Sequence, residues 1–209
     1  MNALRLTLNG VSKEFSRRLI FRGISASLGS GESLAITGRN GSGKSTLVKV
    51  IAGLLSPTRG TIEYSEAGRI LSANDLRDHL GLVSPYLQMY DEFSASENLQ
   101  LLSMIRSDTQ IDDRRLKEVL MMVGLWERRS DYVRTYSSGM KQRLKYAFAI
   151  AHRPSLLILD EPTSNLDSDG IGMVKGLVED QKKKGLLIVA TNDASEAEWC
   201  AGRIDLTRV

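Results

Sequence analysis

Residues 38–46 read Gly38-Arg39-Asn40-Gly41-Ser42-Gly43-Lys44-Ser45-Thr46, and they are the most informative part of the sequence. It matches G-x-x-x-x-G-K-[ST], the pattern of a phosphate-binding loop. Small residues let the backbone curl so that several N–H groups point into one concavity, and the following helix adds partial positive charge at its N-terminus. The pattern predicts that Lys44 reaches the β- and γ-phosphates of a nucleotide and that the Ser45 hydroxyl binds Mg²⁺. The expected phosphate-binding set is Gly38, Asn40, Gly41, Ser42, Gly43, Lys44, Ser45 and Thr46.

The residues on either side of this loop support the same interpretation. Ser33 to Thr37 is a short apolar run typical of a buried strand, and four apolar residues recur at helical spacing after the loop: Leu47, Val50, Ile51 and Leu54. The alternative is a Gly/Ser-rich surface turn. Because strand, loop, Lys-Ser pair and helix all agree, the sequence favours a phosphate-binding loop.

Composition and length limit the classes of protein to which the chain can belong. The 209 residues suit one domain, or a domain with a small insert, and 42% hydrophobic with 25% charged residues is ordinary for a soluble globular protein. A net charge of +3 is too small to argue for a nucleic-acid partner. The single cysteine, Cys200, excludes an internal disulfide and suits a reducing compartment. No apolar run approaches the roughly 20 residues that span a bilayer, and the N-terminus lacks a signal-peptide pattern, so we expect a cytoplasmic protein.

Hydrophobic periodicity predicts an α/β fold with two kinds of sheet. Apolar residues alternate with polar ones from Leu4 to Leu8 and from Ile24 to Leu28, as in half-buried strands of an antiparallel flap. Three further strands are predicted at Leu80 to Val83, Leu156 to Leu159 and Leu186 to Ala190. Helical segments separate these strands, so we expect a mainly parallel sheet covered on both faces.

A helical insert is predicted within residues 94–134. Its first helix is expected to place Leu99, Leu102 and Ile105 on one face, and its second to bury Leu116, Val119, Leu120 and Val123 before Gly124 ends it. The chain is therefore expected to be one domain, 1–209, with a core of residues 1–93 and 135–209 and a small α-helical subdomain at 94–134.

An Asp-Glu pair follows the predicted strand at Leu156 to Leu159. In an open α/β sheet, ligands bind beyond the carboxyl ends of the strands. Asp160 would hold Mg²⁺ and Glu161 would orient, or take a proton from, an attacking water. The alternative is a strand end that merely carries acidic residues, which the nearby phosphate loop disfavours.

A second anion-binding helix start is predicted at Ser137-Ser138-Gly139. A hydroxyl, a bare backbone N–H and the helix dipole act together there. One bound nucleotide has little use for two such sites from one chain. We therefore expect a head-to-tail pair of chains, each offering its Ser-Gly turn to the nucleotide of the other.

In the order of these motifs, the whole chain resembles the nucleotide-binding subunit of an ATP-binding cassette (ABC) transporter. Such subunits are P-loop NTPases. Walker A is Gly38 to Thr46, the signature is Ser137-Ser138-Gly139-Met140-Lys141-Gln142, Walker B is Leu156 to Glu161, and the D-loop is Ser164-Asn165-Leu166-Asp167. The resemblance implies that Phe15 stacks on adenine, with Tyr64 and Phe21 as weaker candidates. It also implies that Ser137 and Gly139 contact the γ-phosphate across the dimer, and that Asp167 helps the two sites communicate.

Two positions depart from the family pattern. Asn192 stands where the family has a switch histidine, and its amide can donate a hydrogen bond but cannot carry charge or relay a proton. An idle, binding-only site is the alternative. Pro85 stands at the usual Q-loop glutamine, so we expect the nearest glutamine, Gln88, to act in catalysis and Mg²⁺ binding from a rearranged loop; the alternative is an exposed loop residue.

The resemblance implies an ATPase that drives transport through separate integral membrane subunits, as a homodimer or as a heterodimer with a second ATPase subunit, at the inner face of the cell membrane. Five residues lie where the family docks its membrane partner and could equally form core: Tyr86, Leu87, Met89, Tyr90 and Phe93. The rival functions are a soluble ABC ATPase of DNA repair or translation, and a regulatory module with little turnover. No long heptad segment of the repair type and no second cassette of the translation type occurs in the sequence.

Overall fold

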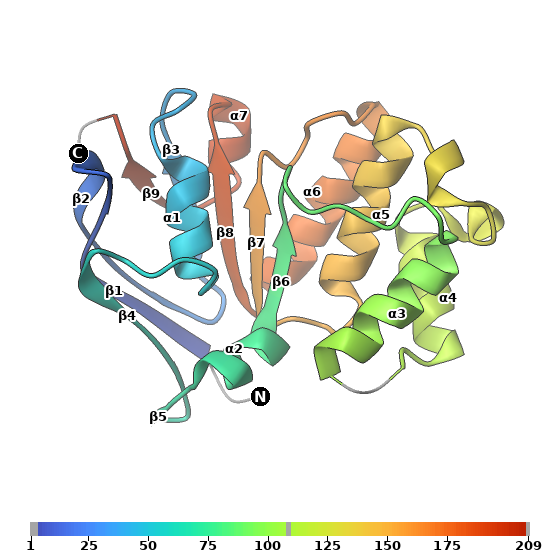
Figure 1. Cartoon of the computed structure of the whole chain (residues 1–209), viewed down its shortest axis with the longest axis horizontal. Helices are drawn as coiled ribbons and strands as arrows, with labels where there is room; N and C mark the ends of the chain where they lie inside the picture. The colour runs from blue at the N-terminus through green and yellow to red at the C-terminus, as the bar shows by residue number, and fades with distance from the viewer. Residues whose placement is uncertain (1–3, 108–109, 208–209) are drawn as a thin grey trace.

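The computed structural model describes residues 4–107 and 110–207, which form two β-sheets and a layer of helices (Figure 1). The first sheet is antiparallel, as predicted for the N-terminal flap. Its strand order is β2 (Arg18–Gly29), β1 (Leu4–Phe15), β4 (Arg59–Glu66) and β5 (Arg69–Ile70). A tight two-residue hairpin joins β1 to β2, with positive φ at both Ser16 and Arg17.

The second sheet is parallel throughout and carries the predicted core strands. Its strand order is β6 (Leu80–Val83), β7 (Leu156–Asp160), β8 (Leu186–Thr191), β3 (Ser33–Thr37) and β9 (Gly202–Asp205). All residues of the three middle strands β7, β8 and β3 are buried, as expected of a sheet covered on both faces. Because the strands run in one direction, their carboxyl ends share one edge, where the loops of the site follow.

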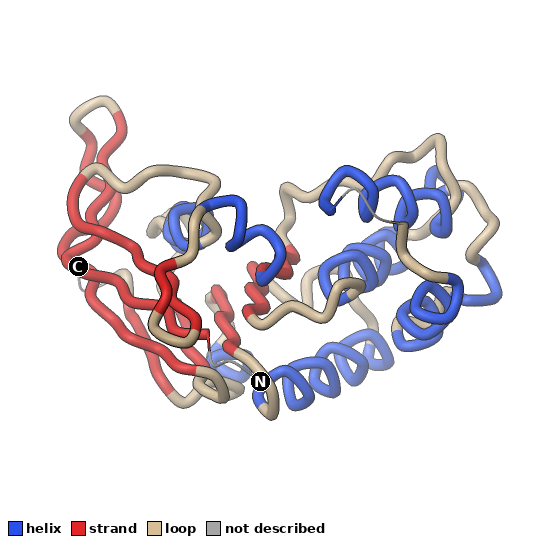
Figure 2. Tube along the Cα trace, turned by 90° about the horizontal axis from the view of Figure 1, so that it is seen from below, coloured by secondary structure: helices blue, strands red, loops and turns tan. Residues whose placement is uncertain are grey.

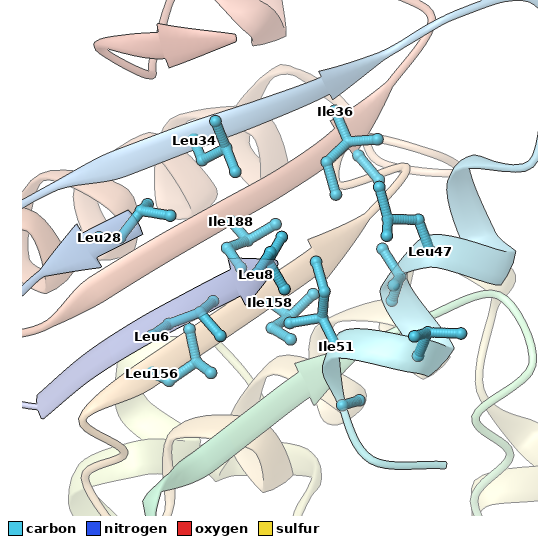
Figure 3. Close-up of a cluster of buried hydrophobic side chains, with 14 of the residues drawn as sticks. Leu6, Leu8, Leu28, Leu34, Ile36, Leu47, Ile51, Leu156, Ile158 and Ile188 are labelled. Atoms are coloured by element: carbon cyan, nitrogen blue, oxygen red, sulfur yellow. The ribbon is translucent and has the colours of Figure 1, made fainter. Parts of the chain in front are cut away.

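Alternate residues of these strands face two different layers. Ile36, Ile158 and Ile188 pack against the antiparallel sheet and the helix that follows the phosphate loop (Figure 3). Their neighbours Leu159 and Val189 face the helical layer instead. Figure 2 shows the antiparallel strands gathered at one end of the molecule and most helices at the other. The helices are α1 (Lys44–Ile51), α2 (Ala73–His79), α3 (Ala95–Ser107), α4 (Asp113–Met122), α5 (Ser138–Ile150), α6 (Ser168–Lys182) and α7 (Ala194–Ala197), with 3₁₀ turns at Trp126–Arg128 and Val133–Thr135.

The predicted helical insert contains α3, α4 and the first 3₁₀ turn, and it ends within the second. Its buried side chains join one hydrophobic cluster with α5 and the sheet, so the insert has no separate core. The four apolar residues predicted on α4 are buried, and Gly124 follows that helix with a φ of 70°. The predicted shared face of α3 is wrong at Ile105, which is 61% exposed while Leu99 is fully buried. At about 100° per residue, six positions place these side chains about 120° apart around the helix. The boundaries 94 and 134 stay a prediction.

A buried asparagine holds the segment of residues 84–94 that links β6 to α3. The Asn98 amide donates to the carbonyls of Tyr90 and Ser94, both at 2.9 Å, and its oxygen accepts from the Tyr90 N–H at 2.8 Å. This side chain is fully buried, so its hydrogen bonds replace those that the loop backbone would otherwise make with water. Within the described residues, no helix combines the length and apolarity that crossing a bilayer requires.

Candidate functional site

The phosphate loop connects β3 to α1 at the carboxyl edge of the parallel sheet. Gly43 is the N-cap of α1 with a φ of 101°, and an added Cβ there would lie 2.5 Å from Cγ2 of Ile20. Both conditions require glycine. Lys44 is only 5% exposed, and its Nζ donates to the carbonyl oxygens of Gly38 (3.0 Å) and Arg39 (3.2 Å). The carbonyls of the loop thus hold the Lys44 ammonium within the loop, where it can bind an anion.

A pocket of about 270 Å³ joins this loop to the end of β7. It brings together six of the eight predicted phosphate-loop residues, Lys44 among them, and Glu161, the carboxylate predicted to act on the attacking water. Its lining is Ile20, Asn40, Gly41, Gly43, Lys44, Ser45, Thr46, Tyr86 and Glu161. A triphosphate in this pocket would meet both a lysine cation and a carboxylate.

Asp160, the residue before Glu161, is a buried carboxylate whose charge the neighbouring side chains compensate only in part. It is 1% exposed, and neither carboxylate oxygen has a hydrogen-bond partner. Burial raises the pKa of Asp160, and the neighbouring Ser45 hydroxyl lowers it in part. An unpaired buried carboxylate is costly, so a cation placed between Asp160 and Ser45 would stabilise it. Within the described residues, no group of three or more His, Cys, Asp or Glu side chains is placed to hold a metal ion, so such a cation would also need water or phosphate oxygens.

The backbone of Glu161 is held in an unusual conformation. Its φ is 53°, a left-handed value uncommon for a residue with a side chain, and its N–H donates to the Ala190 carbonyl at 2.9 Å. Such strain persists only where surrounding structure imposes it. The contact with β8 therefore fixes the direction in which the glutamate leaves the strand.

Asn192, at the predicted switch position, contacts the phosphate loop directly. Its Nδ2 donates to Oδ1 of Asn40 at 3.0 Å. The two asparagines also line a second pocket beside the loop, which does not include Glu161. The switch amide is therefore coupled to the phosphate loop.

A buried glutamate that the sequence analysis missed joins the two loops that carry Glu161 and Asn192. Glu196 on α7 is 4% exposed. One carboxylate oxygen accepts from the N–H (3.2 Å) and the hydroxyl of Thr163, and the other accepts from the hydroxyl of Thr191. Thr163 lies two residues after the catalytic candidate and Thr191 directly before the switch. No sequence motif indicates a role for Glu196, because that role depends on its contact with Thr163, which is distant in the sequence.

We expect Glu196→Ala to lower kcat about tenfold or more while leaving the KM for ATP nearly unchanged. The loss follows because small displacements of a positioned group slow a reaction steeply, whereas the phosphate loop itself stays intact. Steady-state phosphate release measures the split, with the folded fraction checked by thermal melting, since unpaired buried donors cost about 1–3 kcal/mol each. Glu198→Ala, at an exposed site two residues on, is the matched control. Equal losses in both variants would show that Glu196 has no positioning role.

The signature turn lies apart from the phosphate loop of the same chain. Ser137 is exposed and caps α5 by accepting from the Met140 N–H at 3.2 Å, and neither Ser137 nor Gly139 lines the two pockets beside the phosphate loop. In Figure 1, α5 and α1 lie on opposite sides of β6 and β7. Asp167 of the D-loop caps α6 and pairs with Arg143 of α5 at 2.6 Å, which ties the signature helix to the D-loop.

The aromatic candidates for adenine differ in exposure. The Phe15 ring, at the end of β1, is 44% exposed, with Lys13 Nζ 4.9 Å from its centroid. Phe21 and Tyr64 are buried in the core, and the Tyr64 hydroxyl donates to the Ile51 carbonyl, so the two weaker candidates are wrong. Core packing explains both, because each fills the interface between a strand and its neighbours.

Loop 84–94 places a tyrosine, not the predicted glutamine, at the phosphate pocket. Gln88 is exposed and outside the pocket lining, so its assignment stays a prediction, whereas Tyr86 lines the pocket. Of the residues that could dock a membrane partner, Tyr86, Tyr90 and Phe93 are exposed, while Leu87 and Met89 are half-buried. The docking role of the three exposed rings stays a prediction.

This fold and this pocket define a P-loop nucleotide-binding protein. The family model for ABC transporters matches residues 21–164, and the chain therefore belongs to the ABC transporter family. Among curated relatives, the linearmycin resistance ATP-binding protein LnrL of Bacillus subtilis is 32% identical over 96% of this chain and 65% of its own length. The lantibiotic transport ATP-binding protein SrtF of Streptococcus pyogenes is 33% identical over 94% of this chain and 83% of its own length.

Solved structures agree with the assignment. An ATP-binding subunit of an ABC transporter superposes with a TM-score of 0.84 at 29% identity, covering 96% of this chain and 85% of that chain. A dimeric ATP-binding cassette in a post-hydrolysis state, bound to ADP and phosphate, superposes with a TM-score of 0.82 at 25% identity, covering 96% and 93%. The predicted fold class is confirmed.

Proposed function

We propose that this chain binds and hydrolyses ATP to ADP and phosphate, and so drives transport through separate integral membrane subunits. The observation that carries the proposal is the pocket in which the Lys44 loop and Glu161 meet. Phosphoryl transfer to water needs positive charge on the transferring group and a residue that orients the water. The pocket offers both from one chain.

Each site residue then has a distinct role. Lys44 and the backbone N–H groups of the loop bind the β- and γ-phosphates, and Glu161 accepts a proton from, or orients, the attacking water. Ser45 and Asp160 would hold Mg²⁺, which supplies charge neutralisation at the phosphate oxygens when bound; the unpartnered Asp160 oxygens support this. Asn192 donates a hydrogen bond to the γ-phosphate without charge. Gln88 would reach the site only if loop 84–94 moved.

The signature turn acts on the nucleotide of a second copy. Its exposure, and its absence from the lining of the phosphate pocket, support a head-to-tail pair in which Ser137 and Gly139 complete the partner's site. The pair is a homodimer or includes a second ATPase subunit. ATP must bind the closed pair better than the open one if it is to shift the population. The dimeric cassette with ADP and phosphate supports this assembly.

The relatives support the proposed membrane partner and cellular location. SrtF is named for lantibiotic transport, and a further relative, from Bacillus subtilis, for arginine transport. These names favour transport over DNA repair, translation or a purely regulatory role. We propose that the chain works in the cytoplasm, bound to its membrane subunits at the inner face, with no nucleic-acid partner. The exposed rings of Tyr90 and Phe93 would contribute to that contact.

Two measurements test this function. Purified chain should release phosphate from MgATP, and Lys44→Ala should lose both tight ATP binding and release. In cell extracts the chain should co-purify with an integral membrane protein rather than with DNA or ribosomes. Binding of ATP without phosphate release would favour the regulatory module. Co-purification with ribosomes or DNA would favour the soluble ATPases.

A further inference from the structure

Tyr86 occupies a fixed position in a tight turn at the start of loop 84–94. The Leu87 N–H donates to the Ser84 carbonyl at 3.1 Å, and Pro85 stands at the second position of this four-residue turn, where its fixed φ is favourable. The Ser84 hydroxyl is buried and accepts from the Tyr86 N–H at 3.3 Å. Lys145 Nζ of α5 also donates to the Ser84 carbonyl, at 3.4 Å. The turn is therefore attached to α5 while its third residue projects toward the phosphate loop.

A cation on α1 fixes the tyrosine ring on the pocket side. Lys49 Nζ lies 3.9 Å from the ring centroid of Tyr86, a distance typical of a cation–π contact. The same ammonium acts on Asp160, whose pKa it helps to lower against the stronger effect of burial. Tyr86 and Lys49 thus lie together beside the phosphate loop. The Tyr86 side chain remains 67% exposed and is therefore accessible to a ligand.

The pocket lining shows what Tyr86 would meet. It shares the pocket with Lys44, the proposed phosphate ligand, with Ser45, the proposed Mg²⁺ ligand, and with Glu161, the residue proposed to act on the attacking water. We propose that Tyr86 is the residue through which loop 84–94 contacts the nucleotide, its phenol hydroxyl donating a hydrogen bond to the γ-phosphate. Pro85 and this turn replace the glutamine of the family pattern. The assignment rests on the proposed function.

Nucleotide selectivity tests the proposal without relying on turnover. Tyr86→Phe keeps the ring on Lys49 and removes only the hydroxyl. We expect its affinity for a magnesium-bound, slowly hydrolysed ATP analogue with an imido bridge to fall about tenfold to a hundredfold, the range of one hydrogen bond to a charged group. Affinity for MgADP, which lacks the γ-phosphate, should change less than about twofold. Titration calorimetry measures both.

Two variants sharpen the comparison. Tyr132→Phe is the matched control, because Tyr132 is an exposed tyrosine with the Arg134 guanidinium 4.9 Å from its ring and lies outside the phosphate pocket. Gln88→Ala tests the predicted glutamine. Unchanged selectivity in Tyr86→Phe, or a larger loss of selectivity in Gln88→Ala, would overturn the role assigned to Tyr86 but not the proposed function. A wild-type chain that binds neither nucleotide would overturn the proposed function and the assignment with it.

Discussion

Glu161→Gln should retain ATP binding but lose phosphate release by at least about a hundredfold, the usual contribution of a positioned general base. Glutamine keeps the size and one acceptor oxygen of glutamate but cannot take a proton. The left-handed backbone of residue 161 and its bond to Ala190 do not depend on the side-chain charge, so the substitution leaves the loop in place. Single-turnover phosphate release measures the loss.

The same variant should accumulate closed pairs. If hydrolysis separates the two copies, a chain that binds ATP without cleaving it will stay paired in MgATP and remain single in MgADP. Size-exclusion chromatography distinguishes the two states, and an unchanged melting temperature shows that folding is intact. Wild-type turnover in Glu161→Gln would move the catalytic role to another residue of the pocket.

The elements that carry periodic or motif signals were predictable from the sequence, and the reason is local. The apolar runs at β7 and β8 mark strands buried on both faces, and the spacing of Leu116 to Val123 marks one face of α4. The phosphate loop and the Asp-Glu pair follow such strands directly, so parallel pairing alone brings them to one edge. Local pattern and topology therefore led to the same site.

Short elements and long-range contacts were not predictable. β5, β9 and α7 span two to four residues, too few for a period to emerge, and α2 carries one buried residue, Leu76. The role of Glu196 follows only from its contacts with Thr163, in the loop after β7, and with Thr191, the last residue of β8. In the sequence, Tyr86 is one of several aromatic residues in loop 84–94. Only the turn at Pro85 in the folded chain directs it toward the pocket. These features depend on tertiary arrangement rather than on sequence pattern.

Two inactive variants should restore activity to each other if the sites are shared between copies. Lys44→Ala removes the phosphate loop's cation, and Ser137→Arg fills the exposed signature turn. Each alone should lose nearly all phosphate release. In an equal mixture, random pairing of two-fold related chains makes half of the pairs mixed, and each mixed pair holds one complete site, so release should rise toward about a quarter of the wild-type rate.

The recovery arises only from the head-to-tail arrangement. In a mixed pair, the intact phosphate loop of the Ser137→Arg copy faces the intact signature turn of the Lys44→Ala copy, whereas the other site lacks both. If each chain worked alone, the mixture would be no more active than the average of its parts. Mixed pairs trapped in ATP, detected with a size tag on one variant, would show that pairing occurred. Their formation without recovery would mean that the phosphate loop and Ser137 do not meet across the interface. Loss of the α5 cap in Ser137→Arg costs about 1 kcal/mol, so both variants should be compared at a temperature where they remain folded.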